Sequence, residues 1–421
     1  MPTKKMTIQM RFEYLKLMQE RYRHCGKAMR GELLDEMQQM TGLHRKTLIQ
    51  RMASDMRRRP RRKQRGRRYG IEVDDALRVI AESLDYIAAE RLQPDLVPMA
   101  RRLAGHGELS LSSRLEQDLA QISVSTVRRV LQRVGQADAR RLPRKRGHAS
   151  PLTQGIPMRR IPWDESEPGH FETDLVHHCG YSAAGDYVHT LQLIDVATGW
   201  SERVAVLGRS YRVMADGFQR VLHRLPFAVR EIHPDNGSEF FNHHLLHFWG
   251  QQVTGIRLSR SRPWQKNDNR FVEQKNHTLV RNFLGTERLD SVAQTHILNQ
   301  LYERMWLFYN LFQPVMRLQE KTYLPNDDGT HRLQRRFDTA RTPFDRLCAT
   351  NAIAAQERQR LKQLRDQTNP RQLRREIFSL LDELFETPGA TAGITEDVHL
   401  TLTMPSSPQK GAAIPVTLSI D

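Results

Sequence analysis

The sequence predicts a multidomain protein of mixed α and α/β class, with helical units first, an α/β core in the middle and a helical C-terminal region. Three observations lead to this prediction. The chain has 421 residues, whereas single hydrophobic cores stop growing near about 250–300 residues. Apolar residues at helical spacing fill the first third, and strand-forming runs begin at Trp163. Helical spacing returns after residue 290.

The charge balance predicts a polyanionic partner. The chain carries 65 Lys and Arg against 48 Asp and Glu, a formal net charge of +17, and such an excess favours nucleic acid or an anionic membrane surface. No apolar run reaches the length of about 18 residues that suggests a membrane span. The first residues lack the apolar segment of a secretory signal, and three distant cysteines form no disulfide framework or CxxC pair. We therefore expect a cytoplasmic protein, without membrane partners, whose metal ligands are oxygen atoms.

Apolar residues at helical spacing define two N-terminal units, predicted at residues 1–56 and 73–135. In the first, TGLHRKTLIQRM predicts a turn at Thr41–Gly42 and a basic helix over His44–Met52, which is a helix-turn-helix pattern. In the second, SVSTVRRVL predicts another recognition helix that begins at a Ser or Thr N-cap. A bundle that binds protein is the alternative for both. The DNA-binding candidates on these helices are Arg45, Lys46, Arg51, Arg128 and Arg129.

Two basic segments, residues 57–72 and 136–162, are predicted linkers. They contain the runs RRRPRRKQRGRR and RRLPRKR, in which Pro and Gly oppose helix formation and the charges repel one another. Extended basic chain can lie along DNA phosphates, and a solvated linker is the alternative. The candidate phosphate contacts are Arg57, Arg58, Arg59, Arg61, Arg62, Lys63, Arg65, Arg67, Arg68, Arg140, Arg141, Arg144, Lys145 and Arg146.

Strand-forming runs separated by turn residues predict an α/β sheet over residues 163–289. Three consecutive strands, HFETDLVHHC, DYVHTLQLIDVATGW and SERVAVLGRS, predict an antiparallel meander. A βαβ-like half follows. Its predicted elements are a helix ending at Leu225, a strand in VREIHP, a helix over Asn242–Trp249, a strand over Gly255–Ser259 and a helix over Asp268–Leu284.

Three acidic residues stand out by their positions in this core. Asp174 lies within the first strand, where a carboxylate is costly unless it is paired or metal-bound. Asp235 ends the fourth strand before Asn236–Gly237, which permit a sharp turn, and ligand sites of open α/β sheets favour that end. Glu273 lies one position off the apolar stripe of the last helix.

Each acid also has a purely structural alternative. Asp174 can cap a turn or pair with Arg203, Asp235 can serve only in an Asx turn, and Glu273 alone would be read as a solvated helix carboxylate. The combination in order, a strand with Asp, a strand ending in Asp-Asn-Gly and a helix with Glu, favours a shared site over three separate structural roles.

Four motifs resemble the catalytic core of DDE transposases and retroviral integrases, which has an RNase H-like fold: FETDLVHHCG, YVHTLQLIDVATGW, HPDNGSEF and KNDNRFVEQKNHTLVR. Within that group the chain looks like bacterial insertion-sequence transposases of the integrase-core type, especially the ISNCY group. YNLFQPVMRLQEK and FDTARTPFDRL extend the likeness, which covers about residues 160–350 and reaches the N-terminal units only in general type.

The resemblance implies that Asp174, Asp235 and Glu273 are the catalytic residues and metal ligands for two Mg²⁺ ions, with Mn²⁺ as a substitute. It implies phosphodiester hydrolysis at the element's ends and strand transfer into target DNA, by a homo-oligomer associated with the bacterial nucleoid. Sixty residues separate Asp174 from Asp235, and 37 separate Asp235 from Glu273, slightly more than in the retroviral pattern. A catalytically silent DNA-binding repressor and a two-metal nuclease are the alternatives.

Neighbouring residues receive weaker assignments. Lys266 and Lys275, which flank Glu273, are candidates for phosphate contacts or ordinary solvated lysines. Without cysteines at finger spacing, the pairs His177–His178 and His243–His244 are predicted to face the surface or DNA and not to bind zinc. Residues 290–387 are predicted to be helical and to serve protein contacts, and residues 388–421 to form a loose tail.

Overall fold

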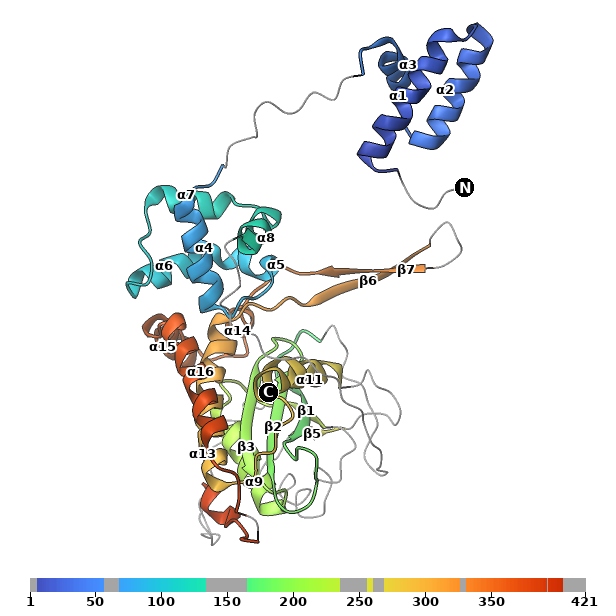
Figure 1. Ribbon diagram of the computed structural model, residues 1–421. Coiled ribbons are helices and arrows are strands. Elements are labelled where there is room, and N and C mark those ends of the chain that lie inside the picture. The colour runs from blue at the N-terminus through green and yellow to red at the C-terminus, as the bar shows by residue number, and fades with distance from the viewer. Residues whose placement is uncertain are drawn as a thin grey trace. The chain divides into compact units, whose positions relative to one another are not determined.

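The computed structural model describes residues 6–56, 68–133, 165–234, 256–259, 269–325, 331–391 and 393–403. The chain forms two compact units, Met1–Arg68 and Tyr69–Asp421 (Figure 1). The first is helical, and the second combines helices with a five-stranded mixed sheet, so the predicted mixed architecture is confirmed. Across the described ranges, no helix has both the length and the apolar character needed to traverse a bilayer.

The first unit packs helices around a core of its own. The described helices are α1 (Ile8–His24), α2 (Lys27–Thr41) and α3 (Arg45–Ala53). Gly42 ends α2 with a left-handed φ of 68°, a conformation that suits glycine. The predicted sequence of helix, glycine turn and basic helix is therefore present. The core contains Leu15, Met18, Leu33, Leu34, Met37, Leu48 and Met52.

Short helices open the second unit. They are α4 (Ile71–Ser83), α5 (Ala89–Leu92), the 3-10 helix η1 (Gln93–Asp95), α6 (Leu96–Gly105), α7 (Ser113–Gln121) and α8 (Val124–Arg133). The last of these lies within the segment SVSTVRRVL, where the sequence predicts a helix that begins at a Ser or Thr N-cap, and α4 packs against α6, α7 and α8. Two ion pairs, Arg371–Glu82 (2.7 Å) and Arg374–Asp85 (2.8 Å), join α4 and the following turn to a C-terminal helix.

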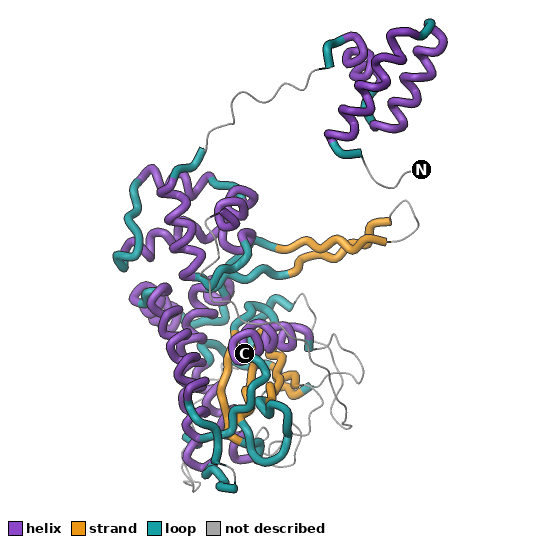
Figure 2. The backbone as a smooth tube through the Cα atoms, viewed as in Figure 1, coloured by secondary structure: helices purple, strands orange, loops and turns teal. Residues whose placement is uncertain are grey.

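The main sheet, whose strands are among those drawn in orange in Figure 2, contains β1 (His170–His177), β2 (Val188–Asp195), β3 (Ser201–Leu207), β4 (Glu231–Pro234) and β5 (Arg257–Leu258). Its strand order is β3-β2-β1-β4-β5. β1, β2 and β3 form an antiparallel meander, while β4 lies parallel to β1 and β5 parallel to β4. This is the predicted meander with a βαβ-like half, and it is consistent with an RNase H-like core.

Helices cover both faces of the sheet. On one face, α9 (Tyr211–Arg224) packs against β3, and Gly217 allows close approach to Leu191 and Val204. On the other, a continuous helix packs against β1 and β2. It consists of α11 (Arg270–Lys275), a π-helical segment η3 (Asn276–Arg281) and α12 (Asn282–Leu284).

The free edge of β3 is covered by helix α13 (Val292–Leu307) and the π-helical segment η4 (Phe308–Phe312). The side-chain amide of Asn299 accepts from the backbone N–H of Ala205 and donates to its carbonyl, both at 2.9 Å. Asn310 makes the equivalent pair with Ser201, also at 2.9 Å. These amides satisfy backbone groups that an edge strand would otherwise leave open.

The C-terminal region contains a hairpin that the sequence analysis missed. Strands β6 (Leu318–Pro325) and β7 (His331–Phe337) pair antiparallel in a separate sheet, drawn as the long orange ribbon of Figure 1. The prediction of a wholly helical region was therefore wrong. Pro325 and the turn-forming sequence Asn326–Gly329 were the local hairpin signal. The helices that follow are α14 (Pro343–Cys348), α15 (Ala355–Gln367) and α16 (Pro370–Glu386).

The chain after α16 is held to the core by hydrogen bonds. Ser291 Oγ donates to the carbonyl of Pro388 (3.1 Å), and the backbone N–H of Thr403 donates to Asp216 Oδ1 (2.9 Å). Between them lies the 3-10 helix η5 (Val398–Thr401). The prediction of a loose tail is wrong for residues 388–391 and 393–403, because their partners lie far away in the sequence. Residues 404–421 lie outside the described residues.

Candidate active site

Two of the three predicted acids lie in the described part of the chain. Asp174 is half-buried on β1, and Glu273 is exposed on α11. Asp235 lies outside the described residues, but it directly follows Pro234, the last residue of β4. Pro234 is the register partner of Thr173 in the parallel pair of β1 and β4. The residues that precede Asp174 and Asp235 in the sequence are therefore direct neighbours across the sheet.

Asp174 is in direct contact with the helix that carries Glu273. Its Oδ2 accepts a hydrogen bond from the side-chain amide of Asn276, one turn after Glu273. Its Oδ1 accepts from the backbone N–H of Leu175 at 2.8 Å. Asn276 also begins the π-helical segment η3, and such segments are frequent at functional sites. The described structure thus brings Asp174 and the Glu273 helix together.

A further acid in the same motif, Glu172, was not singled out in the sequence analysis. It is 1% exposed on β1. Its Oε2 accepts hydrogen bonds from the backbone N–H groups of Phe271 (2.7 Å) and Val272 (2.9 Å) at the start of α11. The available sequence signal was the spacing in FETD, because residues two apart on a strand share one face.

Positive charges surround the start of α11. The guanidinium groups of Arg270 and Arg317 lie 4.6 and 4.8 Å from the ring centre of Phe271. Burial raises the pKa of Glu172 to about 7, although the two backbone hydrogen bonds and these arginines favour its charged form. Desolvation therefore outweighs the favourable interactions of this carboxylate.

A row of polar residues crosses the sheet beneath the helix. Asp174 pairs in register with Gln192, and Gln192 pairs with Arg203, so the three side chains share one face. Arg203 Nη1 donates to the carbonyl of Leu279 (3.2 Å), and its guanidinium lies 5.6 Å from the ring centre of Tyr302. Burial lowers the pKa of Arg203 to about 10. The alternative assignment of Arg203 as the partner of Asp174 is thus not what its described hydrogen bonds show.

The oxygen donors of the predicted site suit a hard divalent cation. Mg²⁺ prefers carboxylate oxygens and keeps several waters, so few protein ligands suffice. Asp174 and Glu273 supply such oxygens, and Asp235 would supply the third set. Within the described residues alone, no three His, Cys, Asp or Glu side chains are grouped so as to hold a metal ion. Two of the three predicted ligands belong to those residues.

Basic neighbours of the site have structural partners. Lys275 Nζ lies 4.8 Å from the ring centre of Tyr309. Arg281 donates to the carbonyl of His177 at 2.8 Å, and burial lowers its pKa. Lys266 lies outside the described residues, as do Asn236 and Trp264.

The histidine pair at the end of β1, His177–His178, differs in part from the prediction. His178 is 1% exposed and its Nε2 lies 2.8 Å from Thr190 Oγ1. Burial lowers the pKa of His178 well below its usual value. The expectation of a surface or DNA-facing residue is wrong for His178, because the sheet continues past the end of β1 and buries it. His177 is half-buried, with its ring 4.8 Å from that of His189. The pair His243–His244 lies outside the described residues.

The candidate DNA-binding residues of the helical units are only partly free in the described structure. Lys46 is exposed on α3, whereas Arg45 forms an ion pair with Asp35. On α8, Arg128 pairs with Glu90, and Arg129 donates to Thr126 Oγ1 at 3.0 Å. Arg51 is half-buried and Arg68 is exposed. The basic residues in 57–67 and 140–146 lie outside the described residues.

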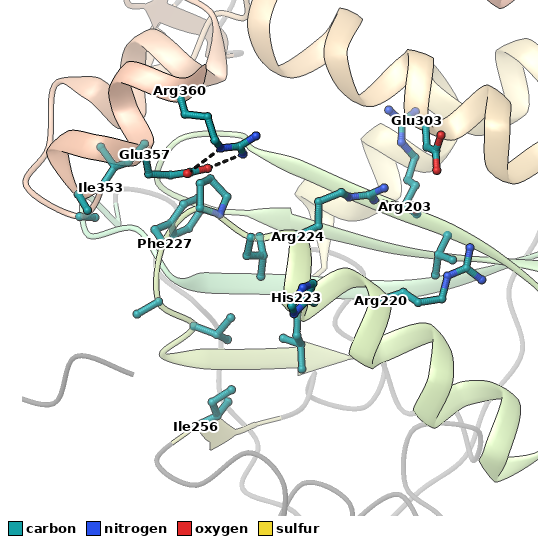
Figure 3. Close-up of a pocket in the computed structure, with 18 of the residues that line it drawn as sticks. Arg203, Arg220, His223, Arg224, Phe227, Ile256, Glu303, Ile353, Glu357 and Arg360 are labelled. Carbon is teal, nitrogen blue, oxygen red and sulfur yellow. Dashed lines mark hydrogen bonds and ion pairs between the residues drawn. The ribbon is translucent and has the colours of Figure 1, made fainter. Parts of the chain in front are cut away.

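A cleft of about 1100 Å³ lies on the α9 side of the sheet (Figure 3). It is bordered by the end of α9, by α13 and by residues 351–360. Two of its arginines form ion pairs: Arg224 with Glu202 at 2.6 Å and Arg360 with Glu357 at 2.5 Å. None of the predicted acids is among its lining residues. The candidate active site is therefore separate from this cleft.

Comparison with known proteins identifies a relative. No protein-family profile matches the chain. Among solved structures, similarity is found to the catalytic core domain of BIV integrase, at 13% identity and a TM-score of 0.26 over 39% of this chain and 90% of that one. It is also found to the simian T-cell lymphotropic virus intasome in complex with PP2A regulatory subunit B56 gamma, at 16% identity and a TM-score of 0.25 over 44% and 59%.

Among curated proteins, the chain is similar to "Uncharacterized protein y4rM" of Sinorhizobium fredii (strain NBRC 101917 / NGR234). The two are 34% identical over 320 residues, which is 76% of this chain and 91% of the relative. Identity at this level over most of both chains places them in one family: this chain belongs to the family of the Sinorhizobium fredii y4rM protein.

Proposed function

We propose that this protein is a polynucleotidyl transferase, and more narrowly a DDE transposase acting on the ends of an insertion sequence. One observation carries the proposal: Asp174 on the central strand accepts a hydrogen bond from Asn276, one turn after Glu273. The strand that leads into Asp235 runs parallel to β1 and ends beside Thr173. Both features support convergence of Asp174, Asp235 and Glu273 at one edge of the sheet.

The proposed chemistry is phosphodiester hydrolysis followed by strand transfer. Bound Mg²⁺ or Mn²⁺, two ions per site, would stabilise the negative charge that develops on the attacking and leaving oxygens. Asp174, Asp235 and Glu273 would hold the ions, and Asn276 would orient Asp174. Water would first attack the phosphodiester at the element's end and release a 3′-hydroxyl. That hydroxyl would then attack a target phosphodiester in line and displace the 3′-oxygen of the target strand, with no covalent enzyme intermediate.

The helical units and basic segments would bind the terminal inverted repeats. The first unit has a core of its own and an exposed Lys46 on α3. The net charge of +17 favours the double-stranded DNA of element ends and target. Joining two element ends to one target brings two catalytic cores together, so we propose a homo-oligomer on DNA, in the cytoplasm and associated with the nucleoid.

The proposal is tested by strand transfer with oligonucleotides of the element's ends and Mg²⁺ or Mn²⁺. Asp174→Asn, Asp235→Asn and Glu273→Gln should each lower joining by at least about 100-fold, because each removes negative charge that holds the ions. Binding to end DNA should persist. Asp75→Asn changes an exposed carboxylate on α4 whose partner is Arg78, and it should leave joining unchanged.

The same assay separates the transposase from its alternatives. A silent DNA-binding repressor would bind end DNA without metal-dependent cleavage or joining. A two-metal nuclease would cleave DNA of random sequence and show no preference for element ends. Inverted repeats of a few tens of base pairs flanking the coding region would support the transposase. Unchanged joining by any of the three variants would remove that residue from the site.

A further inference from the structure

Helix α11 lacks a local cap at its start. The first N–H groups of a helix have no partner within the helix and usually bind the side chain of the N-cap residue. Here the N-cap residue, Asn269, makes no such hydrogen bond. Both polar atoms of its side-chain amide are buried and have no hydrogen-bond partner within the described structure. The helix is also only six residues long before the π-helical segment begins.

The missing cap is supplied by the central strand. Glu172 Oε2 lies 2.7 Å from the backbone nitrogen of Phe271 and 2.9 Å from that of Val272. These are the second and third residues of α11, and Glu273 follows directly. A carboxylate at this place also interacts favourably with the partial positive charge of the helix start. The capping group is thus a buried strand residue 99 positions away from Phe271.

Glu172 and Asp174 hold the helix at two points. They are two residues apart on β1 and therefore project from the same face of the sheet. Glu172 binds the backbone just before Glu273, and Asp174 accepts from the side chain of Asn276 just after it. The segment that presents Glu273 is consequently fixed to β1 on both sides.

We propose that Glu172 is a positioning residue, which fixes the backbone before Glu273 so that the Glu273 carboxylate meets that of Asp174 over bound metal. This inference rests on the proposed function. Glu172 acts through the helix, since the described hydrogen bonds of its carboxylate go to Phe271 and Val272. The length of the Glu172 side chain determines whether it holds the helix, and its negative charge does not.

Two substitutions at Glu172 separate the role of its side-chain length from the role of its charge. Glu172→Gln keeps the side-chain length and an oxygen that can accept from both backbone N–H groups, but it removes the charge. Glu172→Asp keeps the charge and shortens the side chain by one methylene. Glu202→Gln and Glu202→Asp form the matched control pair. Glu202 is also a fully buried strand glutamate, but its partners are Trp200, Trp306 and Arg224.

The variants are compared by strand transfer and by amide hydrogen exchange. Glu172→Asp should lower the turnover number by about 100-fold, the loss that a displacement of about 1 Å can cause, with KM for end DNA unchanged. Glu172→Gln should retain turnover within about threefold. The amides of Phe271 and Val272 should exchange at least about 10-fold faster in Glu172→Asp and at the wild-type rate in Glu172→Gln. The Glu202 variants should leave both amides protected.

Two results would overturn the inference. One is full turnover or full amide protection in Glu172→Asp. The other is a Glu172→Gln protein as inactive as Glu172→Asp while its amides stay protected, because the charge would then matter. If the wild-type protein joins no DNA, the proposed function fails. Hydrogen exchange on the full chain, which needs neither DNA nor metal, then decides separately whether Glu172 holds the helix.

Discussion

The side-chain amide of Asn276 donates a hydrogen bond to the carboxylate of Asp174, and this contact joins the central strand to the helix of Glu273. The two residues are 102 positions apart in the sequence. One carboxylate oxygen of Asp174 accepts a hydrogen bond from the backbone N–H of Leu175, and the other accepts from Asn276. The contact therefore sets the direction in which Asp174 presents its remaining lone pairs.

Asn276→Ala should lower the turnover number for strand transfer by about 10-fold, because Asp174 loses the donor that orients it and a hydrogen bond to a charged group contributes about 1.5 kcal/mol. Affinity for end DNA should stay the same. The measurement is single-turnover joining at saturating DNA. Gln274→Ala, on the same helix but exposed, is the control and should behave as wild type. Equal losses in both variants would argue against an orienting role for Asn276.

Lys46→Ala should weaken binding of terminal DNA, since Lys46 is exposed on α3 beside the buried Leu48. A lost phosphate contact lowers the salt slope of log affinity by about 1. Fluorescence anisotropy between about 50 and 200 mM salt measures this slope. Lys16→Ala removes an exposed lysine from α1 and should leave the slope unchanged. A slope that changes in neither variant would exclude Lys46 from the DNA interface.

Asn299→Ala should lower the free energy of unfolding by about 2 kcal/mol, because both backbone groups of Ala205 lose their partner and each hydrogen bond contributes about 1 kcal/mol. The exposed edge of β3 should also favour aggregation. Urea denaturation and light scattering measure the two effects. Asn351→Ala, an exposed asparagine, should cost little. If both variants lose the same stability, Asn299 does not protect the edge.

Acid should destabilise the fold through His189. Burial, with the nearby charges of His177 and Arg209, lowers the pKa of His189 from 6.5 to about 3. Between these values the unfolded chain binds a proton that the folded protein does not. The free energy of unfolding therefore falls as the pH drops from 6.5 towards 3, by up to about 1.4 kcal/mol per pH unit.

Replacing His189 tests whether this residue causes the loss of stability at low pH. His189→Gln should flatten the decline in stability over that range, measured by urea denaturation at several pH values. His296→Gln, at an exposed position on α13, should keep the wild-type profile. A profile for His189→Gln as steep as that of wild type would assign the acid sensitivity to other groups.

Local patterns predicted the sheet and most helices. The three consecutive strand-forming runs from HFETDLVHHC to SERVAVLGRS, separated by turn residues, predicted the meander, and apolar spacing predicted α9 and α13. The hairpin of β6 and β7 was missed because its strands are charged and lack a strong apolar alternation, and residues 334–337 of β7 are all exposed. The docking of residues 398–403 was missed because Asp216, its partner, lies on a distant helix.

The candidate site was also predicted only in part from the sequence. The residue types and their order predicted Asp174, Asp235 and Glu273 as site residues, because a carboxylate within a strand is costly unless it is paired or bound to metal. The role of Glu172 could not be predicted, because it depends on the backbone of a helix about a hundred residues away. The burial of His178 depends on Thr190 in the neighbouring strand, so it required the sheet register.

The most direct test of the central claim is the number of Mn²⁺ ions that the full-length protein binds, measured by electron paramagnetic resonance with terminal DNA present. If Asp174, Asp235 and Glu273 share a pair of divalent ions, the wild-type protein should bind two ions per chain. The Asp174→Asn/Glu273→Gln double variant should bind none at this site while still binding DNA. Equal Mn²⁺ binding by the wild-type and double-variant proteins would contradict the account.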